Sequence, residues 1–237
     1  MNEQERLLEK EDGRYFAIDR SPTGSGTVSI ATSEKMGNII SFGLPSSPAL
    51  FLHLSYKAYS KIRNINPTDL FNYHPQGYWP DDHGQLFDFF ENFIEHIVFA
   101  QTALEAFANE VIPFSFVFEC KINGVKKMYV KDELERWVTL DEKLSTLLPK
   151  ALNCSTIKGL TQWNKYKEIK DIRDRVIHLK MVDHQSSGSE VKTLWGVMLK
   201  NHAKPYCDYA HEIMGHYKPA VEKRRWYNLY PYETRSR

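Results

Sequence analysis

Six consecutive residues combine side chains that could carry out phosphate chemistry without a metal ion. They read RDRVIH, from Arg173 to His178, and bring a permanent cation, a carboxylate and a titratable imidazole within a turn and a half of a predicted helix. Cleavage of RNA needs a base that removes the 2′-hydroxyl proton and an acid that protonates the leaving 5′-oxygen. Histidine titrates near neutrality and can fill either role, so His178 is the candidate proton-transfer residue.

The other charged residues of this segment suit the same chemistry. The guanidinium of Arg173 offers a planar fork of donors for phosphate oxygens. Asp174 stands four residues before His178, a helical spacing at which its carboxylate could orient the imidazole and raise its pKa. Residues 157–180 hold seven Lys or Arg against three acids, which predicts a positive local field. The remaining candidate RNA-binding cations are Lys170, Arg175 and Lys180.

The helix that carries these residues is predicted from its apolar spacing. Apolar residues recur at three- and four-residue steps at Trp163, Tyr166, Ile169, Ile172, Val176 and Ile177. Five residues at about 100° each place Arg173 and His178 roughly 140° apart around such a helix. One regular helix therefore does not aim both side chains at one phosphate. Either the helix bends near Val176, or a second copy completes the site across a two-fold interface, and we favour the second arrangement.

This pattern resembles a known motif. An arginine, a polar residue, three further residues and a histidine on a late helix are similar to the signature of the HEPN superfamily of nucleases and nucleic-acid-associated helical domains. Arg173, Asp174 and His178 stand at its positions. Residues 103–112 are similar to the first long helix of bacterial members, and residues 140–152 resemble the helix that follows. The likeness covers roughly residues 81–220.

The resemblance implies a metal-independent endoribonuclease that works as a homodimer without a cofactor, in toxin–antitoxin or antiphage defence systems. It implies 2′-hydroxyl attack that leaves cyclic phosphate ends, and an antitoxin or another defence-system protein as a further partner. Inactive members bind RNA or act as interaction modules, so a catalytically silent module is the alternative. The first eighty residues are not part of the common pattern.

Composition limits what else the chain can be. The 237 residues are 42% hydrophobic and carry a net charge of +1, so the overall charge predicts nothing about nucleic acid. The three cysteines have no CxxC spacing, and no apolar run reaches the length of a membrane helix, which favours a soluble, cytoplasmic protein. The segment HEIMGH, from His211 to His216, has one residue too many for a zinc-binding HExxH, so we expect no metal site.

The chain is predicted to be α+β and mainly α, in three parts: an N-terminal α+β region over residues 1–80, a HEPN-like helical bundle over 81–222 and a basic tail over 223–237. Short β-like runs at residues 15–19, 27–31 and 38–42 predict a small antiparallel sheet, and Pro48 suits the first turn of a helix that reaches about Arg63. The tail is either a solvated, frayed terminus or an RNA contact.

The bundle is predicted in more detail. A helix of roughly 25 residues ends at Pro113, followed by a β-hairpin around Asn123-Gly124. Thr139 and Glu142 form a capping box for a helix that Pro149 disturbs or ends, and a last helix runs from Pro205 to about Tyr217. The apolar stripe predicted for the long helix consists of Phe87, Phe90, Ile94, Val98, Leu104, Ala108 and Val111.

Two polar residues of the long helix are candidate supporting groups. Glu105 or Asn109 could reach the motif helix in an antiparallel bundle and hold Arg173 or His178 in place. The alternative is that both simply belong to the polar edge of the long helix.

Overall fold

The computed structural model describes residues 12–19, 26–28, 30–35, 37–71, 83–122, 125–184 and 192–232. Its strands are β1 (Ala17–Asp19), β2 (Gly26–Val28), β3 (Ile30–Lys35), β4 (Asn38–Gly43), β5 (Phe118–Ile122) and β6 (Val125–Tyr129). Its α-helices are α2 (Ser47–Ile62), α3 (Gly84–Val111), α4 (Lys131–Trp137), α5 (Leu140–Glu142), α6 (Leu148–Leu152), α7 (Thr161–Ile177), α8 (Leu194–Asn201), α9 (Tyr206–His216), α10 (Lys218–Val221) and α11 (Arg225–Asn228). Shorter turns are η1 (Pro67–Phe71), η2 (Lys143–Leu147) and η3 (Met181–His184).

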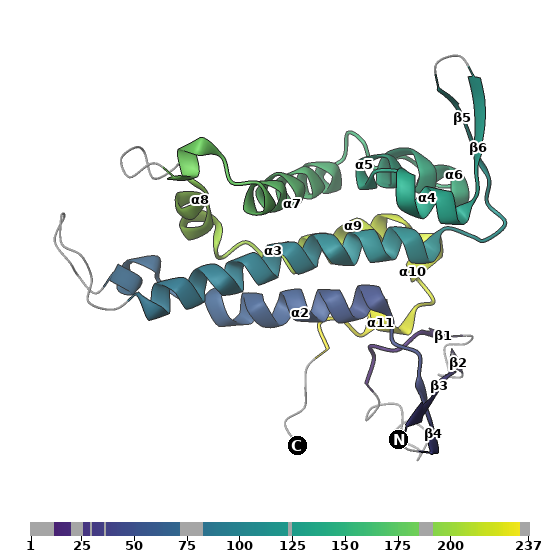
Figure 1. Ribbon diagram of the computed structural model, residues 1–237, viewed down its shortest axis with the longest axis horizontal. Helices are drawn as coiled ribbons and strands as arrows, with labels where there is room; N and C mark the ends of the chain where they lie inside the picture. The colour runs from purple at the N-terminus through teal and green to yellow at the C-terminus, as the bar shows by residue number, and fades with distance from the viewer. Residues whose placement is uncertain are drawn as a thin grey trace.

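The long helix α3 forms the centre of the molecule. Helix α2 packs along one side of it, while α7 and α9 pack against the others (Figure 1). Small strands lie at the periphery, which confirms a mainly helical α+β fold. No helix among the described residues is long and apolar enough to cross a membrane.

Helix α2 forms as predicted, with Pro48 in its first turn and its end at Ile62. Its buried residues Ala49, Leu52 and Ile62 belong to the same apolar core as α3, α7 and α9. The predicted division near residue 80 therefore does not separate two cores. The Pro- and Gly-rich composition before residue 81 predicted a domain boundary. Helices α2 and α3, on the two sides of this stretch, nevertheless pack into one core.

The apolar stripe predicted for α3 agrees only in part with the residues that the structure buries. Its buried residues include Phe89, Phe93, Ile97, Ala100, Leu104, Phe107, Ala108 and Val111. The predicted Phe87 is 56% exposed, and Phe90, Ile94 and Val98 are only partly buried. Helix α3 is apolar on more than one side in its first half, because several elements pack around it. When more than one face of a helix is apolar, the sequence pattern does not indicate which face is the most deeply buried.

The N-terminal strands differ from the predicted single sheet. Strand β1 pairs with β2, and β3 pairs with β4, as two separate antiparallel pairs. Most of β4 is exposed, including Ile39 at 78% and Ile40 at 48%. Alternation of residue types predicted the strands but carried no information on which strands pair.

The predicted β-hairpin is present between α3 and α4. Strands β5 and β6 are antiparallel, with Ile122 opposite Val125 in the register. That register leaves two residues for the connection, as an Asn-Gly turn requires, although residues 123–124 themselves lie outside the described residues. The hairpin stands out from the helical body (Figure 1).

Pro149 disturbs its helix in a specific way. Thr139 caps α5 by accepting the Glu142 N–H, as predicted, and the helix then widens into one π-helical turn, η2, before α6. Because Pro149 has no N–H, it leaves a helical carbonyl without its usual donor. The carbonyl of Ser145 instead accepts a hydrogen bond from Thr156 Oγ1 at 2.7 Å, and that of Leu144 accepts one from the buried Tyr217 hydroxyl at 2.5 Å.

The prediction of a solvated, frayed tail is wrong for residues 223–232, while an RNA contact there stays a prediction. Trp226 is fully buried in the core, and Tyr232 is 8% exposed. Arg225 is buried and donates to the Tyr15 hydroxyl at 2.8 Å, while the Arg224 guanidinium lies 4.3 Å from the Phe16 ring centroid. The aromatic residues between the cations supply the apolar area that anchors this segment. Arg235 and Arg237 lie outside the described residues.

Candidate functional site

Helix α7, which carries the RDRVIH segment, lies against α3 and α9. Tyr166, Ile169 and Ile172 are buried, as their spacing predicted. Trp163 and Val176 are partly buried, whereas Ile177 is 55% exposed. The apolar stripe therefore narrows toward the C-terminal end of α7, where the candidate histidine follows.

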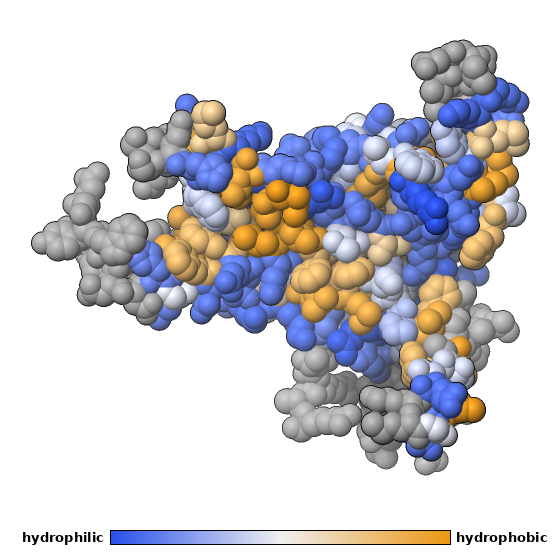
Figure 2. All heavy atoms as spheres, viewed as in Figure 1, coloured by the Kyte–Doolittle hydropathy of each residue, from blue (hydrophilic) through white to orange (hydrophobic). Residues whose placement is uncertain are grey.

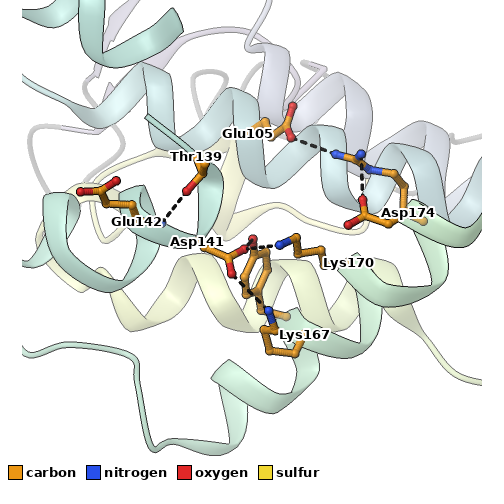
Figure 3. Close-up of polar contacts among 9 residues, drawn as sticks. Glu105, Thr139, Asp141, Glu142, Lys167, Lys170 and Asp174 are labelled. Carbon is orange, nitrogen blue, oxygen red and sulfur yellow. Dashed lines mark hydrogen bonds and ion pairs between the residues drawn. The ribbon is translucent and has the colours of Figure 1, made fainter. Parts of the chain in front are cut away.

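Arg173 is turned toward α3. Its Nη2 atom lies 3.1 Å from Glu105 Oε1, and its Nη1 atom lies 3.0 Å from Asp174 Oδ1 (Figure 3). With its amide oxygen facing the guanidinium, Gln101 also accepts from Nη2 at 2.5 Å and from Nε at 3.1 Å. The expected contact between Glu105 and the motif helix is thus confirmed, and Gln101 is a partner that the sequence analysis missed.

His178 lies just beyond the last turn of α7. Its backbone has left the helical region, with φ −126° and ψ 79°, while its N–H still donates to the Asp174 carbonyl at 2.9 Å. The imidazole is exposed and borders a hollow of about 570 Å³. The hollow is lined by Asp171, Ile172, Asp174, Arg175, His178, Lys180, Leu194 and Val197.

Arg173 is not among the residues that line this hollow. The chain therefore does not bring Arg173 and His178 to one point, as the angle between them on a regular helix led us to expect. Asp174 borders the hollow beside His178, but its carboxylate forms its ion pair with Arg173. Its role in orienting the imidazole stays a prediction.

Arg175 is bound to a buried carboxylate. Asp183 accepts from Arg175 Nε at 3.1 Å and Nη2 at 2.5 Å, and from the backbone N–H groups of Lys180 at 3.0 Å and Leu194 at 2.6 Å. These donors, above all Arg175, lower the pKa of Asp183 to about 2. Arg175 also donates to the Lys192 carbonyl. The pair ties the segment after His178 to the start of α8 and so shapes the hollow.

Lys170 belongs to a second polar cluster on the same helix. Its ammonium lies 3.0 Å from Asp141 Oδ1, and Lys167 lies 3.1 Å from Asp141 Oδ2, so the carboxylate sits between the two lysines (Figure 3). The Tyr166 hydroxyl also donates to Asp141. Burial pushes the pKa of Asp141 up, but these three donors together outweigh burial and lower it.

Asn109 contacts a different partner from the one expected. Its Oδ1 accepts from Lys143 Nζ at 2.8 Å, and Lys143 also donates to the Glu135 carbonyl at 3.0 Å. Lys143 is 5% exposed, and burial lowers its pKa. Asn109 thus anchors a buried lysine of the π-helical turn, which only the three-dimensional arrangement reveals.

The His178 hollow does not carry the positive field predicted from composition. Its cations, Arg175 and Lys180, face the carboxylates of Asp171 and Asp174, and Arg175 is already engaged by Asp183. A phosphate that entered this hollow would meet nearly balanced charge.

The remaining histidines of interest have structural partners. His211 Nε2 lies 3.0 Å from the Tyr227 carbonyl, and His216 Nε2 lies 2.9 Å from the Ser155 carbonyl. Within the described ranges, no group of three or more His, Cys, Asp or Glu side chains is arranged to hold a metal ion.

Comparison with known proteins provides no relative: no family model, no curated protein and no solved structure matches the chain. The site's function must be argued from its residues and their surroundings.

Proposed function

We propose that the protein is a metal-independent endoribonuclease of the HEPN type. The observation that carries the proposal is the position of His178, an exposed imidazole on the rim of a hollow at the end of α7, next to the Asp174–Arg173 ion pair. Exposure lets an imidazole reach a substrate, and the motif spacing supplies the Asp174 carboxylate on the rim of the same hollow.

The chemistry needs one proton removed and one delivered. A base takes the proton of the 2′-hydroxyl, the oxygen attacks the phosphorus, and the bond to the 5′-oxygen breaks as an acid protonates that oxygen. The products are a 2′,3′-cyclic phosphate and a free 5′-hydroxyl. One His178 can perform one of these transfers, so two copies of His178, one from each protomer, would fill both roles.

A second copy is supported by the surface around His178. Ile177, Leu179 and Met181 are 55%, 43% and 83% exposed, and apolar surface gathers near this end of α7 (Figure 2). Clustered exposed apolar residues are typical of protein–protein contacts. A two-fold contact here would place both His178 side chains near one another and bring two Arg173 side chains to their flanks. The homodimer is therefore part of the proposal.

The cellular role follows from the resemblance alone. A toxin or antiphage enzyme in the cytoplasm, restrained by an antitoxin or another defence-system protein, is the setting that the HEPN-like motif implies.

A catalytically silent module that binds RNA or a partner protein is the second candidate. Its support is the state of Arg173, whose guanidinium is engaged by Glu105 and Asp174. An arginine that acts on a phosphate must exchange at least one of these partners. The nearly balanced charge of the hollow favours the protein-binding form of this candidate, because RNA binding needs excess positive charge.

Cleavage of RNA in excess chelator distinguishes the two. We expect the wild-type protein to cut single-stranded RNA and leave cyclic phosphate ends, and His178→Ala and Arg173→Ala to lose cleavage while they remain folded by circular dichroism. His184→Ala, which replaces another exposed histidine in the turn that follows, is the matched control and should keep full activity. Absence of cleavage with retained RNA affinity would establish the silent module, and cleavage by His178→Ala would remove the motif from the mechanism.

A further inference from the structure

A second hollow, of about 330 Å³, lies at the opposite end of α7 from His178. Trp163 and Lys158 border it on one side, and hydroxyl and carboxylate side chains between residues 139 and 146 border it on the other. It combines an aromatic ring, a cation and hydrogen-bonding groups in one concave place. Such combinations are typical of ligand sites.

The indole of Trp163 is held in a defined position. Its centroid lies 5.2 Å from that of Tyr166, at an angle of 43°, and Tyr166 is fixed by its hydrogen bond to Asp141. The ammonium groups of Lys158 and Lys167 each lie 5.9 Å from the indole centroid. A partly exposed aromatic ring with cations close to it is typical of the sites on which unstacked bases of single-stranded nucleic acids stack.

The charges around the hollow indicate which part of a nucleotide it takes. The carboxylates of Asp141 and Glu142 border it, and they would repel a phosphate. The Asp141 carboxylate is already engaged by Tyr166, Lys167 and Lys170. The exposed Glu142 carboxylate can accept a hydrogen bond from an amino group on a base. Lys158 has no carboxylate partner among the described residues, so its ammonium remains available for the phosphate of that nucleotide.

One face of α7 connects this hollow with the His178 hollow. Trp163, Lys167, Lys170, Asp174 and His178 follow one another at spacings of three and four residues, which places them along one side of the helix. Fifteen residues at 1.5 Å each separate the two ends by about 22 Å. An RNA strand can follow this face from one hollow to the other.

We infer that the Trp163 hollow is a nucleobase subsite, in which one unstacked base of a single-stranded RNA lies on the indole, several nucleotides away from the phosphate at His178. This inference rests on the proposed function, which supplies RNA as the ligand. Bases with an exocyclic amino group are preferred over uracil, because Glu142 supplies an acceptor. The site contributes to binding and takes no part in proton transfer.

Binding of an uncleavable probe tests the subsite apart from catalysis. The probe is a fluorescent single-stranded oligoribonucleotide with 2′-O-methyl groups throughout, and its Kd is measured by anisotropy. Trp163→Leu, which keeps apolar volume without a ring, should weaken binding on the order of tenfold to a hundredfold, and Trp163→Phe should keep most of the affinity. Trp137→Leu is the matched control, because Trp137 is 73% exposed on α4, and it should bind like wild type.

A series of probes with one abasic position each locates the stacked base. One abasic position should reproduce the loss seen in Trp163→Leu, and combining the two should cost nothing further. A cytosine at that position should bind more tightly than a uracil, and Glu142→Gln should reduce the difference. Equal affinity of Trp163→Leu and wild type, or equal effects at every abasic position, would overturn the subsite.

Cleavage kinetics separate this inference from the nuclease proposal. For an active enzyme, Trp163→Leu should raise KM and leave kcat unchanged, whereas His178→Ala abolishes kcat. Trp163-dependent binding without any cleavage would uphold the subsite and refute the nuclease. Cleavage with an unaltered KM in Trp163→Leu would uphold the nuclease and refute the subsite. No binding of the wild-type protein to the probe would overturn both proposals.

Discussion

The two arginines of the RDR segment stand two residues apart and have opposite surroundings. Arg175 holds Asp183, whose side chain is 0% exposed, with two further backbone donors on the same carboxylate. Arg173 pairs with Glu105 and Asp174, whose side chains are 47% and 43% exposed. A buried, saturated pair organises the local fold, whereas an exposed pair can exchange partners at little cost. The structure thus gives Arg175 a structural role, whereas Arg173 can bind a ligand only if it exchanges Glu105, Asp174 or the buried Gln101.

Removal of the buried carboxylate should produce the largest effect. Asp183→Ala leaves the Arg175 guanidinium and the N–H groups of Lys180 and Leu194 without their acceptor. Loss of one partner of a buried pair costs about 3–5 kcal/mol of unfolding free energy, which urea denaturation would measure. Glu105→Ala is the comparison, with an expected cost of about 1 kcal/mol or less. Similar costs for the two variants would contradict the contrast between the arginines.

His96 is a second buried polar group, and its burial makes the stability of the fold depend on pH. Ser55 Oγ donates to the His96 carbonyl at 2.7 Å, and the Tyr206 N–H donates to His96 Nε2 at 3.1 Å, so the neutral ring carries its proton on Nδ1, which faces the Ser55 carbonyl at 3.1 Å. Burial lowers the pKa of His96 to about 4.

Because that pKa lies below the value of the unfolded chain, the unfolded chain takes up the proton first as the pH falls. Stability is fully present above about pH 6.5 and decreases by up to about 3 kcal/mol as the pH falls to about 4. Burial also lowers the pKa of His53 and of His211, which adds to the same slope. Denaturation series from pH 7.5 to 4 should show this slope, and His96→Gln should lose most of it; an unchanged slope in that variant would exclude His96 as its source.

Asp183 adds a separate acid transition. Its pKa is lowered in the folded state, so its contribution is present above about pH 4 and is lost as the pH falls toward 2, with a size of about 2 kcal/mol. Asp183→Asn should remove this loss in denaturation measured between pH 4 and pH 2.

The smallest effect is expected for the exposed pair itself. A double-mutant cycle with Arg173→Gln and Glu105→Gln should give a coupling energy of about 0.2–1 kcal/mol in unfolding free energy. The same two variants should change RNA affinity in opposite directions if Arg173 binds phosphate. Arg173→Gln should weaken binding, whereas Glu105→Gln frees the guanidinium and should tighten binding. A coupling above about 2 kcal/mol in stability would place Arg173 with Arg175 as a structural group.

The local elements could be predicted from the sequence for local reasons. Pro48 at a helix start, the Thr139 cap and the two-residue spacing between β5 and β6 all depend on neighbouring residues, and the structure confirms them. The reach of Glu105 to the motif helix was also predictable, because two long amphipathic helices have few ways to pack. The single sheet, the frayed tail and the position of Phe87 were wrong, since each depends on partners distant in the chain.

The sequence by itself determined the helices α2, α3, α7 and α9, the hairpin and the separation of Arg173 from His178, but not α4, α8, α10 or α11. The separation was predictable because helical geometry sets the angle between side chains at a given spacing. Apart from the predicted contact of Arg173 with Glu105, only the tertiary structure decided which acceptor each of these cations meets. Asp183 captures Arg175, Asp141 takes Lys167 and Lys170, and Asn109 receives Lys143. The residue types indicate that buried charged groups need hydrogen-bonding partners. Packing across the core decides which partner each group has, because it brings together residues far apart in the chain.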